Sequence, residues 1–222
     1  MQMSTSDVEL YVSVIIPAYN EAARVGDVVR GALAFADEVI VVDDGSSDDT
    51  ASVAEAAGAR VVRQSNAGYI AAVKRGFRQA RGAVVVTMDA DGEHRAQDIP
   101  SVVAPIAEGH ADLVLGCRQQ IARFSERFLN WLTHLRVPQV HDTGTGFRAM
   151  RRELALKLQL QGRCICGVSV LEPIALGARV TEVPIQLTRV QKPRRIAWFH
   201  LPQVWYVLEW LIGSKEKKGS RI

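Results

Sequence analysis

Hydrophobic residues in the first half of the chain alternate between short β-branched runs and longer stretches with helical spacing. Residues 12–16 form a continuous apolar run that stops at Pro17, which is typical of a buried parallel strand. Residues 21–35 repeat their apolar positions every three or four residues, which predicts a helix. By the same criteria the predicted strands are 12–16, 39–42, 60–63, 83–88 and 112–115, and the predicted helices are 21–35, 50–57, 69–80 and 96–108.

This order of elements predicts an α/β fold with a mostly parallel sheet flanked by helices. In such sheets, ligands bind beyond the carboxyl ends of the strands. Four polar segments follow predicted strands, so we expect them to meet on one rim of the sheet. They are residues 17–21, 43–49, 64–68 and 89–94.

Composition supports one folded domain, since 48% of the 222 residues are hydrophobic. The formal net charge is only +3, and we expect no nucleic-acid partner. Lysines and arginines outnumber acidic residues from Lys192 onward, which suggests an anionic surface or ligand near that end. Three cysteines argue against a disulfide framework and indicate reduced thiols. No apolar run approaches the ~18 residues of a membrane span.

The most specific chemical feature is the Asp89-Ala90-Asp91 sequence at the end of a predicted strand. Residues two apart in an extended chain point to the same side, so both carboxylates can face one ligand while Ala90 points away. Their mutual repulsion favours a divalent cation, and Mg²⁺ or Mn²⁺ prefers oxygen ligands completed by substrate phosphates. The alternative is a turn or helix cap, because Asp91-Gly92 is also a good turn pair.

The acidic turn at residues 43–49 allows two compatible interpretations. Its acidic and hydroxyl side chains could recognise a base or ribose, or could cap the following helix through Ser47 or Asp48. The usual glycine-rich phosphate-binding motifs are missing: there is no G-x-x-x-x-G-K-[ST] loop, and no G-x-G-x-x-G follows the first strand.

Several motifs, taken in order, resemble those of the family 2 glycosyltransferases of GT-A fold. They are residues 12–21, 43–48, 88–92, 116–118, 142–148 and 182–185, followed by Arg189. The set is similar to the polyprenyl-phosphate sugar transferases, the dolichyl-phosphate mannosyl- or glucosyltransferase-like branch. The resemblance covers roughly residues 10–195, and it implies a GT-A domain over residues 1–195.

The resemblance implies a metal-dependent, inverting hexosyltransferase that uses a UDP- or GDP-sugar, of the kind that builds cell-envelope glycans. Which nucleotide and which sugar it uses stay open. The implied nucleotide-binding residues are Pro17, Ala18, Tyr19, Glu21, Asp44, Asp89, Ala90, Arg189 and Arg195, with Asp44 reading the base and Arg189 meeting the diphosphate. The implied ligands of Mg²⁺ or Mn²⁺ are Asp89, Asp91 and Glu93. The implied catalytic set is Asp91, Arg118 and Asp142, with Arg118 meeting the acceptor phosphate.

The mechanism depends on the acceptor. A polyprenyl phosphate has a second pKa near ~6 and is already an anionic nucleophile at neutral pH, so it needs cationic positioning more than a base. A glycan or small-molecule hydroxyl would instead require Asp142 as a general base. A third alternative is a non-catalytic nucleotide-sugar-binding protein, since residues 192–195 depart from the usual family pattern.

The C-terminal part, residues 196–222, is predicted to be an amphipathic helical segment with a basic end. Tryptophans and aliphatic residues at positions 196–213 precede the basic tail, as in helices that lie on a membrane surface. Packing on the domain and dimer formation are the alternatives. A second basic and aromatic stretch contains Arg123, Phe124, Arg127, Phe128 and Trp131. We therefore expect a cytoplasmic enzyme, peripheral on the cytoplasmic face of a membrane, whose oligomeric state is open.

Overall fold

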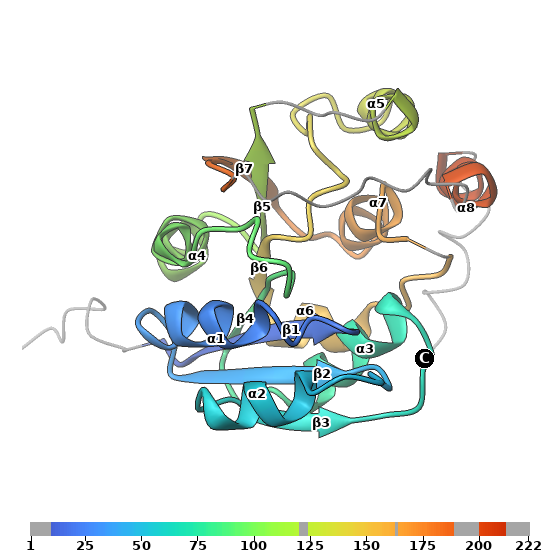
Figure 1. The fold of residues 1–222 in the computed structure, drawn as a ribbon. Helices are drawn as coiled ribbons and strands as arrows, with labels where there is room; N and C mark the ends of the chain where they lie inside the picture. The colour runs from blue at the N-terminus through green and yellow to red at the C-terminus, as the bar shows by residue number, and fades with distance from the viewer. Residues whose placement is uncertain (1–9, 120–123, 163, 189–199, 212–222) are drawn as a thin grey trace, which may run out of the picture.

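The computed structural model describes residues 10–119, 124–162, 164–188 and 200–211 of the 222-residue chain. A seven-stranded sheet runs through the centre of the described part, with helices on both faces (Figure 1). The strands are β1 (Val12–Ala18), β2 (Glu38–Asp43), β3 (Arg60–Arg63), β4 (Val84–Thr87), β5 (Leu113–Arg118), β6 (Arg148–Arg151) and β7 (Val180–Ile185). The helices are α1 (Val25–Leu33), α2 (Thr50–Ala56), α3 (Tyr69–Gln79), α4 (Ile99–Ala107), α5 (Phe124–His134), α6 (Arg152–Lys157), α7 (Val168–Ala175) and α8 (His200–Leu211), and the short 3-10 helix Ala96–Asp98 precedes α4.

The strand order is β3-β2-β1-β4-β6-β5-β7, and only β6 runs against its neighbours. The parallel strands that follow one another along the chain are joined by helical crossovers, as the alternating pattern of the sequence predicts. The fold is therefore the expected mostly parallel α/β sheet, with one reversed strand that the sequence pattern did not predict.

Neighbouring strand residues supply two separate cores, one on each face of the sheet. Ile16 and Val86 belong to the core under α1, α2 and α4, while Ile15 and Val85 belong to the core under α3, α6 and α7 (Figure 1). Alternate residues of a strand point to opposite faces, so a strand that is covered on both faces must be apolar throughout. This explains the continuous β-branched runs that identified the strands.

The carboxyl ends of β3, β2, β1 and β4 meet on one edge of the sheet. Ala18 is paired with Asp43, and Asp43 is paired with Arg63, so the first three strands end side by side. Because β6 is reversed, Arg148 at its start lies beside Thr87 at the end of β4. The residues that lead into β6 therefore reach the same edge as the four predicted polar segments.

All elements predicted in residues 10–115 are present, with small shifts at their ends. The helix predicted over residues 21–35 begins at Val25, because residues 22–24 form a turn. Helix α8 lies within the predicted segment 196–213, whose remaining residues lie outside the described part of the chain. The division at residue 195 stays a prediction. Among the described residues, no helix combines the length and the apolar character needed to cross a bilayer.

Candidate active site

Two loops at the carboxyl edge are tied together by hydrogen bonds from backbone N–H groups to side-chain oxygens. Asn20 adopts a left-handed φ of 55°, and its N–H donates to Ser46 Oγ at 2.9 Å. In return, the Ser47 N–H donates to Asn20 Oδ1 at 2.8 Å. The Ala22 N–H donates to Asp48 Oδ2 at 3.2 Å. The loops after β1 and β2 therefore form one rigid wall, and Asp48 has a structural part in it.

Asp44 is buried and fixes the loop that leads into α3. Its carboxylate accepts hydrogen bonds from the backbone N–H groups of Ala67 and Gly68, both at 2.8 Å, and from Gln64 Nε2 at 2.7 Å. These bonds bring the segment after β3 to the rim, as expected. Base recognition by Asp44 stays a prediction, and it would have to use a carboxylate that is already held by three donors.

The predicted nucleotide-binding residues of the first loop differ in accessibility. Pro17 and Ala18 end β1 and are buried, whereas the Tyr19 side chain is exposed on the rim. Glu21 lies near the start of α1, where its side chain is mostly buried and forms an ion pair with Arg24 at 3.3 Å. Among these four predicted residues, only Tyr19 therefore presents an open side chain to a ligand.

Asp89 lies at the centre of the rim, held by residues from two other segments. Tyr69 Oη, at the start of α3, donates to Asp89 Oδ1 at 3.2 Å. Burial and then the charge of Asp89 raise the pKa of Tyr69 well above its usual value, so the phenol remains a donor. The Asp89 N–H donates to Nδ1 of the buried His94 at 3.2 Å. Asp89 therefore has a defined orientation before any ligand binds.

Gly146, from the loop before β6, packs directly against the Asp89 carboxylate. Its carbonyl oxygen accepts a hydrogen bond from Thr87 Oγ1 at 2.7 Å, which fixes the loop beside the end of β4. A Cβ atom at this position would overlap both carboxylate oxygens of Asp89. Glycine is needed at position 146 because the backbone approaches the Asp89 carboxylate too closely for any side chain. The loop before β6 is therefore part of the surroundings of Asp89.

The alternation predicted for residues 89–91 is present in the structure. Asp89 and Asp91 are half-buried, while Ala90 between them points into the core. Asp91 Oδ1 also accepts a hydrogen bond from the Glu93 N–H at 3.1 Å, around a Gly92 with a φ of 77°. Asp91 therefore takes part in a turn, which the sequence allowed as the alternative to metal binding. Its partial exposure leaves it compatible with ligand binding as well.

The ligand atoms that this segment offers fit a hard divalent cation only in part. Asp89, Asp91 and Glu93 offer carboxylate oxygens, the type of ligand that Mg²⁺ and Mn²⁺ prefer. Within the described ranges, no three His, Cys, Asp or Glu side chains gather closely enough to hold a metal by themselves. Magnesium commonly binds through one or two carboxylates and completes its shell with substrate phosphates and water. The segment therefore fits a cation that arrives together with a diphosphate.

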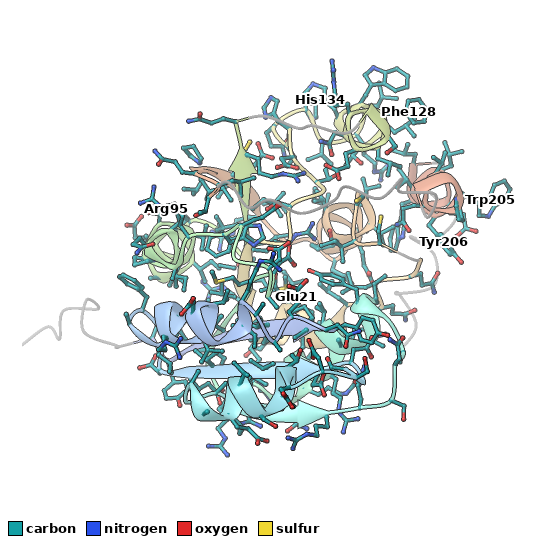
Figure 2. All side chains as sticks on the ribbon, viewed as in Figure 1. Glu21, Arg95, Phe128, His134, Trp205 and Tyr206 are labelled. Atoms are coloured by element: carbon teal, nitrogen blue, oxygen red, sulfur yellow. The ribbon has the colours of Figure 1, made fainter. Side chains whose placement is uncertain are left out.

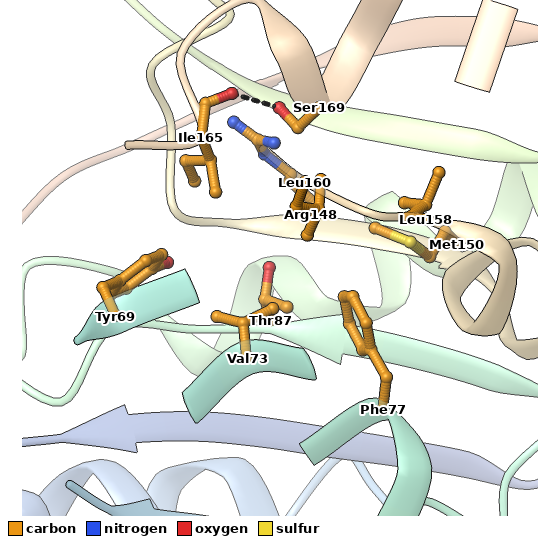
Figure 3. Close-up of a pocket in the computed structure, with 10 residues that line it drawn as sticks. All are labelled: Tyr69, Val73, Phe77, Thr87, Arg148, Met150, Leu158, Leu160, Ile165 and Ser169. Carbon is orange, nitrogen blue, oxygen red and sulfur yellow. Dashed lines mark hydrogen bonds between the residues drawn. The ribbon is translucent and has the colours of Figure 1, made fainter. Parts of the chain in front are cut away.

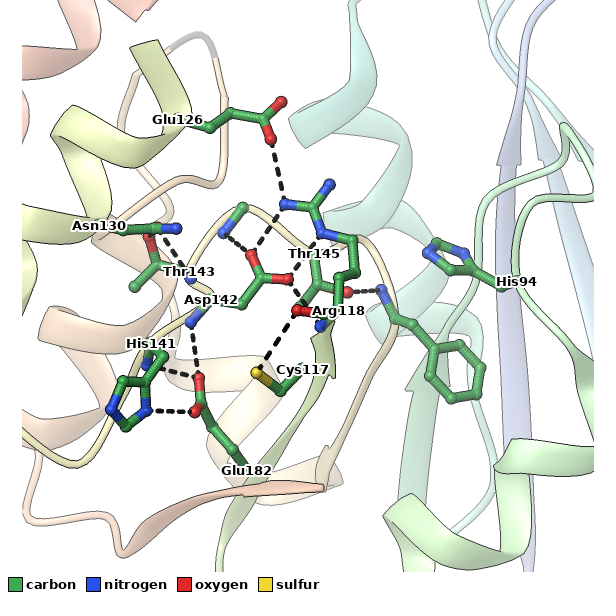
Figure 4. Close-up of polar contacts among 12 residues, drawn as sticks. His94, Cys117, Arg118, Glu126, Asn130, His141, Asp142, Thr143, Thr145 and Glu182 are labelled. Atoms are coloured by element: carbon green, nitrogen blue, oxygen red, sulfur yellow. Dashed lines mark hydrogen bonds and ion pairs between the residues drawn. The ribbon is translucent and has the colours of Figure 1, made fainter. Parts of the chain in front are cut away.

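Arg118 and Asp142 form a buried, two-pronged ion pair beside this segment (Figure 4). Arg118 Nε donates to Asp142 Oδ2 at 2.6 Å and Nη2 donates to Oδ1 at 2.8 Å. Nη2 also donates to Glu126 of α5 at 3.1 Å. Burial opposes the charge of Arg118, but Asp142 and then Glu126 outweigh it and raise the pKa of the guanidinium. Arg118 therefore stays charged, and Asp142 is held as its counterion.

Glu182, within β7, positions the chain that carries Asp142. It accepts hydrogen bonds through Oε1 from the backbone N–H groups of His141 and Asp142, at 2.8 and 2.7 Å. Burial and then Glu182 and Asp142 raise the pKa of the neighbouring Cys117 thiol to about 11. Cys117 is therefore a neutral thiol at physiological pH and a poor candidate for a nucleophile.

Arg148 is buried behind the loop and holds it from within. Its Nε donates to the Thr145 carbonyl at 2.8 Å and Nη2 donates to the Thr143 carbonyl at 2.7 Å. Burial lowers its pKa. A cavity of about 10 Å³, large enough for one water, adjoins the guanidinium and is also lined by Tyr69 and Ser169 (Figure 3). Arg148 therefore stabilises the loop that carries Asp142 and Gly146.

The structure brings the predicted Asp89, Asp91, Arg118 and Asp142 to one edge of the sheet, together with residues that the sequence pattern did not indicate. The unexpected ones are Tyr69, Glu126, Gly146 and Arg148, whose contacts come from distant segments. The signal available for Gly146 and Arg148 is that both belong to the motif at residues 142–148. The predicted Arg189 and Arg195 lie outside the described residues.

Comparison with known proteins gives a consistent family. The model of Glycosyl transferase family 2 matches residues 13–169. An undecaprenyl-phosphate 4-deoxy-4-formamido-L-arabinose transferase of Shewanella sediminis is 33% identical over 162 residues, which cover 65% of this chain and 49% of that protein. An uncharacterised glycosyltransferase of Mycobacterium bovis is 37% identical over 162 residues, 68% of this chain and 72% of that protein. The chain thus spans about half the length of the first of these relatives.

Among solved structures, the fold is similar to that of Mycobacterium tuberculosis glucosyl-3-phosphoglycerate synthase. The TM-score is 0.78 at 25% identity, over 92% of this chain and 81% of that one. Another structure of the same synthase contains Mn²⁺, UDP and glucosyl-3-phosphoglycerate, and matches with a TM-score of 0.73 at 25% identity, over 93% of this chain and 80% of that one.

Proposed function

The chain belongs to glycosyl transferase family 2 and is a glycosyltransferase, and from this premise we propose that it transfers a sugar from a nucleotide-sugar to a polyprenyl phosphate. The first relative described above is an undecaprenyl-phosphate transferase, which supports the acceptor class. The donor would be a UDP- or GDP-sugar, and the transfer would depend on Mg²⁺ or Mn²⁺ and invert the anomeric centre.

The observation that carries the proposal is the paired state of Asp142. A general base must reach the proton that it abstracts, but the Asp142 carboxylate is fully buried and both of its oxygens accept hydrogen bonds from the Arg118 side chain. Both oxygens are therefore already engaged before an acceptor hydroxyl could approach them. An acceptor that is already anionic needs no base, so this arrangement supports a phosphate acceptor over a hydroxyl.

On the donor side, the Asp89–Asp91 segment would bind the diphosphate of the nucleotide-sugar together with the cation. A bound cation would stabilise the charge that builds up on the departing nucleoside diphosphate. Tyr69 and Gly146 would hold the Asp89 carboxylate in one orientation. Glu93 and Asp44 would complete the site, with Arg189 and Arg195 closing on the donor as the resemblance implies.

On the acceptor side, Arg118 would orient the lipid phosphate. The guanidinium keeps its charge, and the hydrogen bonds that it donates to Asp142 fix its plane, so that the incoming anion meets a preorganised cation. The phosphate would then be aimed at the anomeric carbon without a proton transfer. In this mechanism Asp142 positions Arg118.

A panel of UDP- and GDP-sugars, assayed with and without Mn²⁺ or Mg²⁺ and a short-chain polyprenyl phosphate, tests the proposal. We expect nucleotide release that requires both the cation and the lipid phosphate. We expect Asp91→Asn to abolish that release while keeping a native circular-dichroism spectrum. Asp27→Asn, a surface substitution on α1, is the matched control and should retain activity. Transfer to hydroxyl acceptors alone, or full activity of Asp91→Asn, would contradict the proposal.

A second candidate acceptor is a small phosphorylated hydroxy acid, because the solved relative is a glucosyl-3-phosphoglycerate synthase and the structural match covers most of this chain. Arg118 could bind the phosphate of such a compound equally well. Transfer would then go to a hydroxyl, and Asp142 would have to leave Arg118 to act as a base. Adding 3-phosphoglycerate to the same assay distinguishes the two acceptors.

A further inference from the structure

Helix α5 buries Leu129 and Leu132 in the core, but it also buries polar residues and exposes large apolar ones, which is unusual for a helix on a water-facing surface. Glu126, Asn130 and Thr133 are buried against the domain. On the outer side, the side chains of Phe128 and Trp131 are 41% and 56% exposed. Their rings stack, with centroids 5.9 Å apart. Leu135, one residue beyond the helix, is 62% exposed and extends the outer face.

The inward orientation of the polar residues is fixed by specific bonds to the candidate site. Glu126 accepts a hydrogen bond from Arg118 at 3.1 Å. Asn130 Oδ1 accepts two bonds from Thr143, from the backbone N–H at 3.0 Å and from Oγ1 at 2.6 Å. Rotating the helix to hide its aromatic residues would break these buried bonds. The apolar face is therefore turned outward by the same contacts that form the acceptor side of the site.

The neighbouring helix α8, which packs against α5, buries Val207 in the core and likewise combines a buried polar residue with an exposed aromatic one. Gln203 is fully buried, where it accepts a hydrogen bond from the Cys164 N–H and donates to the Cys166 carbonyl, both at 3.3 Å. Trp205, by contrast, is 67% exposed. Phe128 and Trp205 project outward from the α5 and α8 side of the molecule (Figure 2). Two adjacent helices thus give one outer face, made of Phe128, Trp131, Leu135 and Trp205, which we call the interfacial face.

The interfacial face carries a charge of each sign, since Arg127 lies on α5 and Glu209 of α8 accepts a hydrogen bond from Trp205 Nε1 at 2.9 Å, and the sequence that follows α8 is basic. Arg127 is exposed on α5 and, with Trp131, lines an open groove of about 310 Å³. The sequence after α8 adds four basic residues and a single acidic one: Lys215, Lys217, Lys218 and Arg221 against Glu216. Exposed tryptophans with flanking Lys and Arg are the combination by which helices bind the boundary between lipid headgroups and acyl chains. The occupant that matches both the apolar surface and the charge is a membrane that contains anionic lipid.

We propose that the interfacial face docks on the surface of an anionic membrane and thereby places Arg118 at the level of the lipid headgroups. The inference rests on the proposed function, because a polyprenyl phosphate presents its phosphate at that level. Helices of this kind lie parallel to the surface, with their apolar side chains about 5–10 Å below the headgroups. Glu126 and Asn130 connect the inner side of the docked helix to Arg118 and to the loop that carries Asp142.

Co-sedimentation of the full chain with vesicles, in the absence of donor and acceptor, tests this docking. We expect binding to phosphatidylglycerol–phosphatidylcholine vesicles and weaker binding to phosphatidylcholine alone. Phe128→Ser combined with Trp131→Ser should weaken the binding by about tenfold or more, since affinity scales with buried apolar area. Arg127→Gln should weaken it by about fivefold, as expected for one charge near an anionic surface. Phe35→Ser, which replaces an exposed aromatic residue after α1, is the matched control and should leave binding unchanged.

Vesicles with brominated acyl chains report how deeply the tryptophans insert, because bromine quenches tryptophan fluorescence. We expect quenching in the native chain and less quenching in Trp131→Ser and in Trp205→Ser. Absence of binding to anionic vesicles, or unchanged binding of the double variant, would overturn the proposal. If the native chain were a dimer that did not bind vesicles, and the double variant were a monomer, the interfacial face would instead be the contact with a second copy of the chain. Vesicle binding without sugar transfer to any lipid phosphate would refute the proposed acceptor and leave the docking intact.

Discussion

Gly146 shows how a residue without a side chain can define the site. The loop before β6 passes so close to Asp89 that a methyl group at position 146 would overlap the carboxylate. The backbone of Gly146 is also held by Thr87, so the loop cannot easily move away. Any added atom must therefore displace the carboxylate of Asp89.

We expect Gly146→Ala to reduce kcat/KM by about a hundredfold, since a shift of about 1 Å in a positioning group costs that much. Binding of Mn²⁺ with UDP or GDP, followed by electron paramagnetic resonance, should weaken in parallel. Gly31→Ala, within α1, is the control: its added Cβ would meet only Ala96 at 3.4 Å, so activity should be retained. Native activity in Gly146→Ala would show that Asp89 does not work in the orientation described.

At the residue scale, the sequence predicted a feature that depends on local periodicity alone. The two outward carboxylates around a buried Ala90 follow from the period of a strand, and the structure confirms that alternation. Tyr69 and Glu126 could not be found in this way. Their contacts with Asp89 and Arg118 connect residues that only the folded sheet brings together.

At the level of elements, β6 and β7 were the strands that the sequence pattern did not reveal. Strand β6 reads Arg-Ala-Met-Arg, and both arginines bond to groups outside the strand. Strand β7 lies at the sheet edge, is only partly buried and contains Pro184. Edge strands tolerate proline and need no continuous apolar run, so their pattern is weak. The central strands were predictable because both of their faces are covered.

Asp112 joins the starts of β5 and β7. It accepts a two-pronged pair from Arg179, with Nε and Nη2 both at 3.0 Å, and a bond from Arg151 Nε at 3.1 Å. The hydrogen bond from Arg179 holds the pKa of Asp112 well below its usual value, although burial opposes the shift. Because the pKa of Asp112 is lower in the folded chain than in the unfolded chain, the ionised carboxylate stabilises the fold at pH values above ~3.9, the pKa in the unfolded chain. This stabilisation is lost as the pH falls toward the pKa of Asp112 in the folded chain.

We therefore expect Asp112→Asn to lower the melting temperature by about 3 °C at pH 7. The difference from the native chain should shrink as the pH falls below about 4, where the unfolded chain becomes protonated. Thermal unfolding followed by circular dichroism across this range measures the effect. Glu55→Gln, which removes the exposed pair with Arg63, should change little. A difference that grew toward acid pH would contradict the sign of the shift.

At the scale of the whole molecule, two groups of adjacent strands carry different parts of the candidate site. Strands β3, β2, β1 and β4 carry the loops expected to bind the nucleotide, and we call them the donor half. Strands β6, β5 and β7, with α5, α7 and α8, carry Arg118 and Asp142, and we call them the acceptor half. The halves meet where Gly146 touches Asp89.

This division predicts that acceptor recognition can be weakened without loss of nucleotide affinity. Arg118→Lys keeps a charge beside Asp142 but loses the planar, two-pronged geometry. We expect kcat/KM for the lipid phosphate to fall by about tenfold or more. Calorimetry should show UDP or GDP binding unchanged within about twofold, since the side-chain hydrogen bonds described for Arg118 are made to Asp142 and Glu126 of the acceptor half. Arg63→Lys, on the donor half, is the matched control. A parallel loss of nucleotide affinity in Arg118→Lys would refute the division.

The reversal of β6 has a consequence for how such enzymes diversify. Because β6 is antiparallel to β5, the end of β5 and the start of β6 lie at the same edge of the sheet, where Leu115 is paired with Arg148. A segment with adjacent anchor points can be lengthened or exchanged at a cost that grows only slowly with its length. Exchange of the part of the segment between β5 and β6 that precedes Asp142, including α5, could therefore graft a new acceptor preference while Gly146 keeps its contact with Asp89.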